Sequence, residues 1–331
     1  MSRTLLVQAS PHIAAPDSTP KIMWNVVGSL VPIVVTATYY FGPSALLVIA
    51  AATAGAMVTE ALFGPPGALA DGSAAITGVL LGLTLPAGLP LWMAFVGSAF
   101  GIGLGKLVFG GLGQNVFNPA LLGRAFLQAA FPVALTTWPT RDGSWWSLAG
   151  DNLALPLMSP EVVDSMTGAT PLGLMKFEQV ATEAGPLVMG STGGSLGETA
   201  GIVILICAGY LALRNYLNWR IPASIFLTVA VLSSIANAVG STLPSPVFML
   251  FSGGLILGAT YMATDMVTSP VTNRGAWVFG FGIGFLVVVI RLWGGLAEGV
   301  MYAILLMNAL VPFINRATQP RVFGTLPEPA S

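Results

Sequence analysis

Charged side chains are scarce in this chain, and their scarcity limits the possible folds more than any other feature. Lys, Arg, Asp and Glu together make up 8% of the residues, while 55% are hydrophobic and the mean hydropathy is +0.83. Soluble globular proteins carry about 25% charged residues. Because so few polar side chains cannot cover a water-facing surface, the composition excludes a soluble enzyme and predicts a polytopic membrane protein.

The residue counts also exclude several kinds of site. With 12 Lys and Arg against 13 Asp and Glu, the chain is close to neutral, so there is no electrostatic basis for binding nucleic acid. A single cysteine, Cys207, excludes an intramolecular disulfide, and a single histidine, His12, argues against a zinc or haem site. Any redox chemistry would therefore have to come from a bound cofactor.

Long apolar segments follow one another along most of the chain. A membrane-spanning helix needs about 20 mostly apolar residues. Ten segments are predicted to be such helices: 23–41, 44–63, 73–90, 91–109, 117–136, 196–213, 221–240, 246–264, 276–292 and 297–314. Gly, Pro and polar residues interrupt the third and the fifth. We therefore expect an all-α fold of about ten transmembrane helices.

These segments divide the chain into a tail (1–22), five helices (23–136), a long loop (137–195), five more helices (196–314) and a second tail (315–331). The first tail has no long apolar core, which is typical of a cytoplasmic tail and not of a cleaved signal peptide. With both termini inside, eight Lys and Arg fall on the cytoplasmic side and two in the external loop. This asymmetry follows the positive-inside rule.

A short pattern occurs in both halves of the chain. It reads Phe-Gly-Gly-Leu at 109–112 and Trp-Gly-Gly-Leu at 293–296, and a proline lies 24 positions before each glycine pair. Because five is an odd number, a second copy of five helices would be inverted in the membrane, with the working site near the midplane. The pattern predicts an inverted 5+5 repeat, although Gly-rich apolar segments can also match by chance.

Polar residues enter an apolar segment at 110–124. In lipid an unsatisfied polar group costs several kcal/mol, so Asn115, Asn118 and Arg124 must have partners. The pair Asn118-Pro119 would break a helix and could leave backbone N–H groups facing a ligand. The alternative is that these residues cap a helix and form hydrogen bonds between helices.

Other charged residues fall inside or beside the apolar segments, and such residues are candidates for functional sites. Asp71 and Asp265 are expected near the cytoplasmic face, where a carboxylate could collect a cation. Helix capping or contact with interfacial water is the alternative. For Glu60 and Glu298 we favour a structural role.

The external loop contains the stretch Asp164-Ser165-Met166-Thr167-Gly168-Ala169-Thr170. Its small residues would leave the threonine hydroxyl accessible to a modifying enzyme. From the residues alone, this stretch is a turn.

Three motifs together carry a resemblance to a known family. The pattern Asp-x-x-Thr-Gly-Ala-Thr at 164–170 resembles a flavin-attachment motif, in which a flavin transferase esterifies the last threonine with FMN and releases AMP from FAD. Two further stretches, Gly-Gly-Leu-Gly-x-Asn-x-Phe-Asn-Pro-Ala at 110–120 and Ala-Thr-Asp-x-Val-Thr-Ser-Pro at 263–270, resemble the same family. That family is the membrane-embedded D subunit of the Rnf ion-translocating electron-transport complex, which is related to the B subunit of the sodium-translocating NADH:quinone reductase. One departure is Met266, where the family pattern usually has proline.

The resemblance implies a flavin at the external loop. Thr170 would carry the covalent FMN, and Asp164, Thr167, Gly168 and Ala169 would form the motif that the flavin transferase recognises.

The resemblance also implies a second, non-covalent riboflavin within the membrane. We place it at Asn115, Asn118 and Leu121, because amide side chains in an apolar pocket suit a neutral isoalloxazine ring.

The family further implies a multi-subunit complex in the bacterial inner membrane that couples electron flow between ferredoxin and NAD to translocation of Na⁺ or H⁺. Neighbouring subunits would carry flavin and iron–sulfur groups, and ferredoxin and NAD would bind there.

A channel or transporter for a small solute is the alternative function. A 5+5 inverted repeat resembles the architecture of urea and ammonium channels, and Asn-Pro breaks occur in pores. Colour separates the two functions, since an electron carrier would purify yellow and a channel would be colourless.

Overall fold

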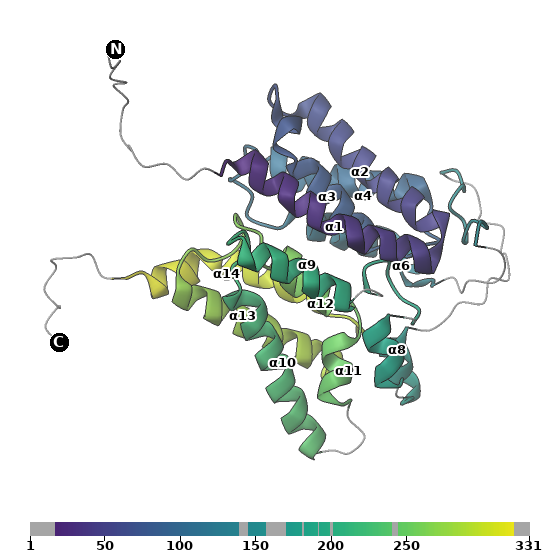
Figure 1. Cartoon of the computed structure of the whole chain (residues 1–331), viewed down its shortest axis with the longest axis vertical. Coiled ribbons are helices and arrows are strands. Elements are labelled where there is room, and N and C mark those ends of the chain that lie inside the picture. The colour runs from purple at the N-terminus through teal and green to yellow at the C-terminus, as the bar shows by residue number, and fades with distance from the viewer. Residues whose placement is uncertain are drawn as a thin grey trace, which may run out of the picture.

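The computed structural model describes residues 17–138, 145–156, 170–180, 182–190, 192–198, 201–239 and 244–320. Within these ranges the regular secondary structure is entirely helical. Figure 1 shows the helices of the first half lying together above those of the second half. The start of α1 and the end of α14 lie at one end of the molecule, and α6 and α8 lie at the other.

The first half consists of helices of unequal length joined by turns. Its elements are α1 (Thr19–Phe41), α2 (Pro43–Phe63), the turn η1 (Ala68–Asp71), α3 (Ser73–Leu83), α4 (Leu91–Ile102), the π-helical η2 (Gly103–Leu107), α5 (Pro119–Ala130) and α6 (Pro132–Thr136).

The second half begins after three short elements, α7 (Pro171–Gly173), η3 (Leu174–Glu178) and α8 (Ala184–Met189). It consists of α9 (Gly201–Leu213), α10 (Arg220–Val239), α11 (Pro246–Phe251), α12 (Leu255–Leu257), the π-helical η5 (Gly258–Met262), α13 (Asn273–Trp293) and α14 (Val300–Thr318).

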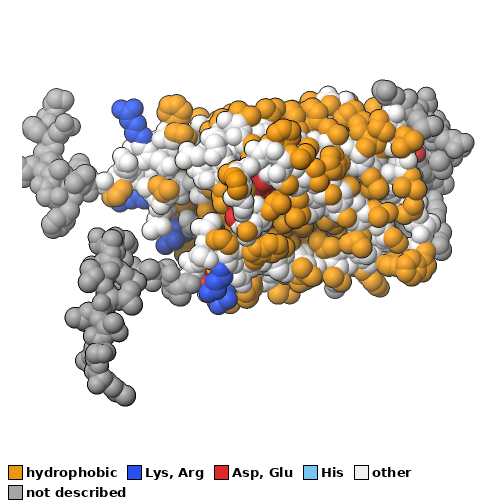
Figure 2. Space-filling model, turned by 90° about the horizontal axis from the view of Figure 1, so that it is seen from above, with side chains coloured by type: hydrophobic (Ala, Val, Ile, Leu, Met, Phe, Trp, Pro, Cys, Tyr) orange, Lys and Arg blue, Asp and Glu red, His pale blue; other side chains and the backbone are white. Residues whose placement is uncertain are grey.

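In the part of the chain that the structure describes, five helices are long and apolar enough to cross a membrane, namely α1, α2, α10, α13 and α14. Large apolar side chains project outward from them, such as Val35 on α1, Leu62 on α2 and Phe313 on α14. Figure 2 shows hydrophobic side chains over the middle of one face, with Lys and Arg gathered at one end. A surface of this kind suits lipid, and the chain is a multi-pass membrane protein with an all-helical fold.

Helices occupy part of every predicted apolar segment, but four segments are clearly shorter or broken, the sixth because its helix begins only at Gly201. The third ends at Leu83, the fifth breaks at Phe131 before Pro132, and the eighth is interrupted at 252–254. The third and fifth interruptions were expected from their Gly and Pro content. The break in the eighth was not expected; it has Gly253 at φ +65°, which favours glycine. The number of membrane crossings stays a prediction.

The two halves share a pattern of helix contacts. In the first half α2 packs against α3 and α4, and α4 packs against α5. In the second half α10 packs against α11 and α13, and α13 packs against α14. Between the halves, α1 contacts α9 and α5 contacts α14.

Small residues let the helix backbones approach closely. A Cβ on Gly82 of α3 would lie 2.7 Å from Ile49 Cα of α2, and a Cβ on Gly280 of α13 would lie 2.7 Å from the Ile221 carbonyl oxygen of α10. Because lipid tails are as apolar as the side chains, close packing of this kind holds membrane helices together.

The broken end of α3 is satisfied by a segment from the second half. Leu196 N donates to the Leu85 carbonyl at 3.1 Å, and Gly197 N donates to the Leu83 carbonyl at 2.6 Å. These bonds replace the hydrogen bonds that the helix loses, and they fix the position of Glu198, the next residue.

Candidate functional site

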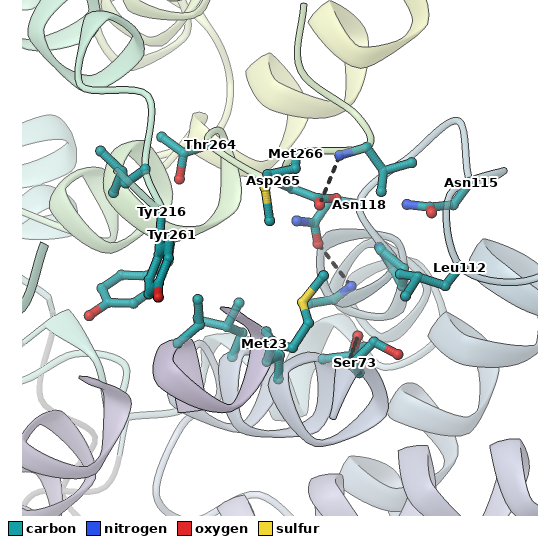
Figure 3. Close-up of a pocket in the computed structure, with 18 of the residues that line it drawn as sticks. Met23, Ser73, Leu112, Asn115, Asn118, Tyr216, Tyr261, Thr264, Asp265 and Met266 are labelled. Carbon is teal, nitrogen blue, oxygen red and sulfur yellow. Dashed lines mark hydrogen bonds between the residues drawn. The ribbon is translucent and has the colours of Figure 1, made fainter. Parts of the chain in front are cut away.

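A central cavity of about 90 Å³ lies where α3, α5 and η5 meet. It combines apolar walls with a few polar groups. Figure 3 shows Asp265 and Met266 above the space, Met23 and Ser73 below it, and Tyr261 to its left. Other polar groups that line it include Thr77, Lys106, Asn115, Asn118, Thr260 and Thr264. This mixture is typical of a pocket for a largely apolar ligand with a few polar atoms.

Asn118 is the helix cap that the Asn-Pro pair suggested. Its Oδ1 accepts from Ala120 N at 3.0 Å and from Leu121 N at 3.3 Å, and its Nδ2 donates to the Met262 carbonyl at 3.2 Å. With its amide oriented to satisfy both neighbours, Asn308 of α14 accepts from Asn118 N at 3.2 Å. Asn118 therefore caps α5 and joins the two halves, and it also lines the central cavity.

The other two predicted riboflavin residues differ in their position. Asn115 lines the central cavity, and its Nδ2 donates to the nearby Phe117 carbonyl at 3.3 Å. Leu121 is buried in the main hydrophobic core and is not among the residues that line the cavity. The structure thus brings the two asparagines to one space, while Leu121 packs behind them.

The two predicted ion-path carboxylates lie on different elements. Asp265 lines the central cavity, where it accepts from Val267 N at 3.3 Å and from Thr268 Oγ1 at 3.1 Å. Asp71 ends η1 and accepts from Ser73 N at 2.7 Å. Both carboxylates accept local hydrogen bonds, and Ser73 connects Asp71 to the wall of the cavity that Asp265 also lines.

Lys106 is a functional candidate that the sequence analysis missed. The predicted topology counted it among the Lys and Arg of the cytoplasmic side; in the structure its side chain is only 3% exposed and forms an ion pair with the buried Glu60. Lys106 Nζ also donates to Ser73 Oγ at 2.5 Å and lies 4.0 Å from Asp71 Oδ2. The π-helical turn η2 carries Lys106, and such turns are often found at functional sites. We call these four residues the Lys106 cluster.

A second cavity, of about 130 Å³, is lined by Thr170 and is called the Thr170 cavity here. Thr170 is half-buried, and its Oγ1 accepts from Gly173 N at 3.1 Å. The remaining lining residues include Arg124 and Gln128 of α5, Glu198, Glu298 and Tyr302. The rest of the predicted attachment motif, Asp164 and Thr167 to Ala169, lies outside the described residues.

Arg124 and Glu298 form a partly buried ion pair between the halves. Arg124 Nη2 lies 2.9 Å from Glu298 Oε2, and Glu298 Oε1 accepts from Gly254 N at 2.7 Å. The sequence indicated that Arg124 needs a partner. That partner is Glu298, for which the sequence favoured a structural role. The two residues are 174 positions apart in the sequence, so no local sequence pattern could predict that they pair.

Arg291 braces the break between α11 and α12. Its Nη1 donates to the Met249 carbonyl at 2.6 Å and its Nη2 to the Ser252 carbonyl at 2.9 Å. These two carbonyls lose their helical partners at the break, so the buried guanidinium replaces the missing donors. Nearby, Lys176 donates to the carbonyls of Ile290 and Leu296, and burial lowers the pKa of its ammonium group.

Comparison with known proteins identifies the family. The family described as NQR2, RnfD, RnfE matches residues 6–324. This chain belongs to that family. The D subunit of the proton-translocating ferredoxin:NAD(+) oxidoreductase complex of Clostridium ljungdahlii is 40% identical over 96% of both chains. The D subunit of the Na(+)-translocating ferredoxin:NAD(+) oxidoreductase complex of Acetobacterium woodii is 40% identical over 97% of this chain and 95% of its own. The D subunit of the ion-translocating oxidoreductase complex of Stutzerimonas stutzeri is also 40% identical, over 93% of both.

The NQR2, RnfD, RnfE family is the one that the three motifs predicted. Relatives named as proton-translocating and as Na(+)-translocating share the same identity with this chain, so the comparison does not favour either ion. Among the described residues no group of three His, Cys, Asp or Glu could hold a metal ion.

Proposed function

We propose that this chain is the membrane flavoprotein subunit of an Rnf-type complex, which couples ferredoxin and NAD redox chemistry to translocation of Na⁺ or H⁺. Family membership over almost the whole chain supports this function, and the Thr170 cavity is the observation that carries the flavin part. Other Rnf subunits bearing flavin and iron–sulfur groups would be its partners.

The covalent flavin is assigned to Thr170. The hydroxyl would attack the FMN phosphorus of FAD in the flavin transferase, forming a Thr170 Oγ1–phosphorus bond, breaking the pyrophosphate bond and releasing AMP and a proton. A cavity of about 130 Å³ is slightly smaller than the roughly 150 Å³ that accommodates benzene, so it takes part of the flavin and leaves the rest at the surface. When bound, FMN would supply reversible electron transfer.

In-gel flavin fluorescence tests this assignment directly. The denatured wild-type subunit, produced together with its flavin transferase, should give a fluorescent band, and Thr170→Ala should give a dark one. Thr136→Ala is the matched control, because Thr136 lines the same cavity and should leave the fluorescence unchanged. A dark wild-type band beside a labelled control protein would show that 164–170 is only a turn.

The central cavity is our proposed riboflavin site. Asn115 and Asn118 supply amide groups, and the apolar walls suit the ring. Its volume of about 90 Å³ is too small for a three-ring system as it stands. Met23 and Met266 line opposite parts of the space, and methionine side chains move readily, so their displacement would admit the ring.

The ion path is proposed to pass Asp71 and Asp265. Both carboxylates adjoin the central cavity, Asp265 directly and Asp71 through Ser73 and Lys106. Asp71→Asn or Asp265→Asn should reduce ion pumping by the purified, reconstituted complex more than electron transfer, while Asp151→Asn, in the loop before α7, should reduce neither. Intact pumping in both test variants would remove these residues from the path.

The finer architecture is proposed to be a ten-helix inverted repeat with both termini in the cytoplasm. The shared helix contacts of the two halves support it, and so do two matched contacts between them. Arg124 and Asn308 both lie 14 positions after the first glycine of their repeat, and each contacts the segment before the last helix of the other half. Single cysteines introduced by Lys21→Cys and Leu153→Cys, with Cys207→Ser, should react with membrane-impermeant reagents from opposite sides.

A small-solute channel remains the alternative because the fold and its asparagines would also suit a pore. Its test is the colour of the purified protein: a colourless preparation made with an active flavin transferase would favour the channel.

A further inference from the structure

The Arg124–Glu298 ion pair lies in the cavity that Thr170 also lines, although neither charged residue belongs to the attachment motif. Arg124 is 8% exposed and forms its ion pair through Nη2. Glu298 is held from its other side by Gly254 N. The pair is therefore fixed to the broken α11–α12 segment, and Arg124 faces the Thr170 cavity from α5.

The residues around Gly253 bring the attachment segment close to this pair. A Cβ placed on Gly253 would lie 2.6 Å from Leu172 Cδ1, 3.1 Å from Arg291 Nη2 and 3.4 Å from Glu298 Oε1. Leu172 follows Thr170 by two residues and lines the same cavity. The segment that carries the attachment threonine thus packs at Gly253, which also lies beside the carboxylate of Glu298.

The charges around the Thr170 cavity bear on how a flavin would behave there. Among the described residues, the lining contains one cation, Arg124, and two acidic residues, Glu198 and Glu298. FMN esterified to Thr170 would add a phosphodiester with one negative charge, and each electron that the flavin accepts adds another until a proton compensates it. In a partly buried site of low dielectric constant, such charges act on each other more strongly than in water.

We propose that Arg124 is the positioning residue that balances the negative charge of the flavin at Thr170, and that Glu298 orients Arg124 and offsets part of its charge. This inference rests on the proposed function of Thr170. The ion pair, which joins the two halves of the chain, would then control the reduction potential of the flavin.

The two members of the pair should therefore have opposite effects on the flavin. In Arg124→Gln the cation is lost, the reduced flavin is less well stabilised and the midpoint potential should become more negative. In Glu298→Gln the opposing anion is lost, and the midpoint potential should become more positive. Arg220→Gln removes a cation that does not line this cavity and lies over the Trp219 ring, so it should leave the potential close to that of the wild type.

Spectroelectrochemical titration of the purified complex measures these shifts, and in-gel fluorescence of each variant shows that its FMN is attached. Shifts of the same sign in Arg124→Gln and Glu298→Gln, or no shift in either, would overturn the proposal and leave the pair with a structural role. Should Arg124→Gln fail to accumulate, Glu298→Gln decides alone, because it removes a charge while keeping the shape of the side chain. A wild-type band without fluorescence would instead contradict flavin attachment at Thr170, and the two failures are thus distinguishable.

Discussion

Under the inverted repeat proposed above, Lys106 and Arg291 would occupy corresponding places in the two halves, but they have different partners. Each lies near the end of the fourth helix of its half, just before the repeated glycine pair, and each reaches the third helical segment of the same half. Lys106 precedes its glycine pair by four residues and Arg291 by three. Under the proposed repeat, the π-helical turn η2 would account for the extra residue, since a π turn inserts one residue into a helix.

The partners of these two cations differ in whether they can titrate. Lys106 contacts two carboxylates, Glu60 and Asp71, and a hydroxyl, whereas Arg291 donates to two backbone carbonyls. Carboxylates can bind a proton or a cation, but carbonyls within a fixed helix break cannot change their charge. The comparison teaches that Lys106 is held by ionisable groups beside the central cavity, whereas Arg291 supports a break between two helices.

The largest loss of stability is expected when the Lys106 cluster loses its cation. Lys106→Met would leave Glu60 buried without its partner, and breaking one side of a buried ion pair costs about 3–5 kcal/mol. Thermal unfolding of the purified protein in detergent should show a strongly lowered midpoint.

A double variant separates charge from packing in this prediction. Glu60→Gln combined with Lys106→Met removes both charges and should recover much of the lost stability, since replacing a buried pair as a whole is often nearly neutral. If the double variant is as unstable as Lys106→Met, the shape of the lysine matters and not its charge.

A smaller loss of stability is expected when Arg291 is exchanged for a residue that keeps the charge but not the hydrogen-bond geometry. Arg291→Lys retains a cation but cannot place two separate N–H groups on the Met249 and Ser252 carbonyls. Losing one charged hydrogen bond should cost about 1.5–3 kcal/mol, again measured by thermal unfolding. Arg220→Lys is the control, and an equal loss of stability there would show a general effect of the exchange.

The smallest effect on stability is expected at the contact between the halves. Asn118→Ala removes the cap of α5 and should cost about 0.5–2 kcal/mol. Asn115→Ala loses only a local bond and should cost less. Both variants should purify with less riboflavin, measured by chromatography after extraction. Unchanged riboflavin in both would place that ligand elsewhere and leave Asn118 as a cap.

Local patterns in the sequence were enough to predict many of these elements. The long apolar runs predicted helices at α1, α2, α10, α13 and α14, because hydropathy is a property of consecutive residues. The Asn-Pro pair predicted a helix break at 118–119 with capping as the alternative, and in the structure Asn118 caps α5, which begins at Pro119. The burial of Lys106 could not be predicted in the same way, since a lysine at a segment end usually reaches water and only the packing of α2 and α3 encloses this one.

The sequence by itself determined that this chain is a helical membrane protein of the NQR2, RnfD, RnfE family, and it marked Thr170, Asn115, Asn118, Asp71 and Asp265 as candidates for chemistry. The tertiary structure decided which of these meet. It placed Asn115, Asn118 and Asp265 around one cavity and brought Thr170 to another with Arg124 and Glu298. The physical reason is that buried polar groups in lipid must find partners wherever the fold provides them, and those partners lie up to 174 positions apart.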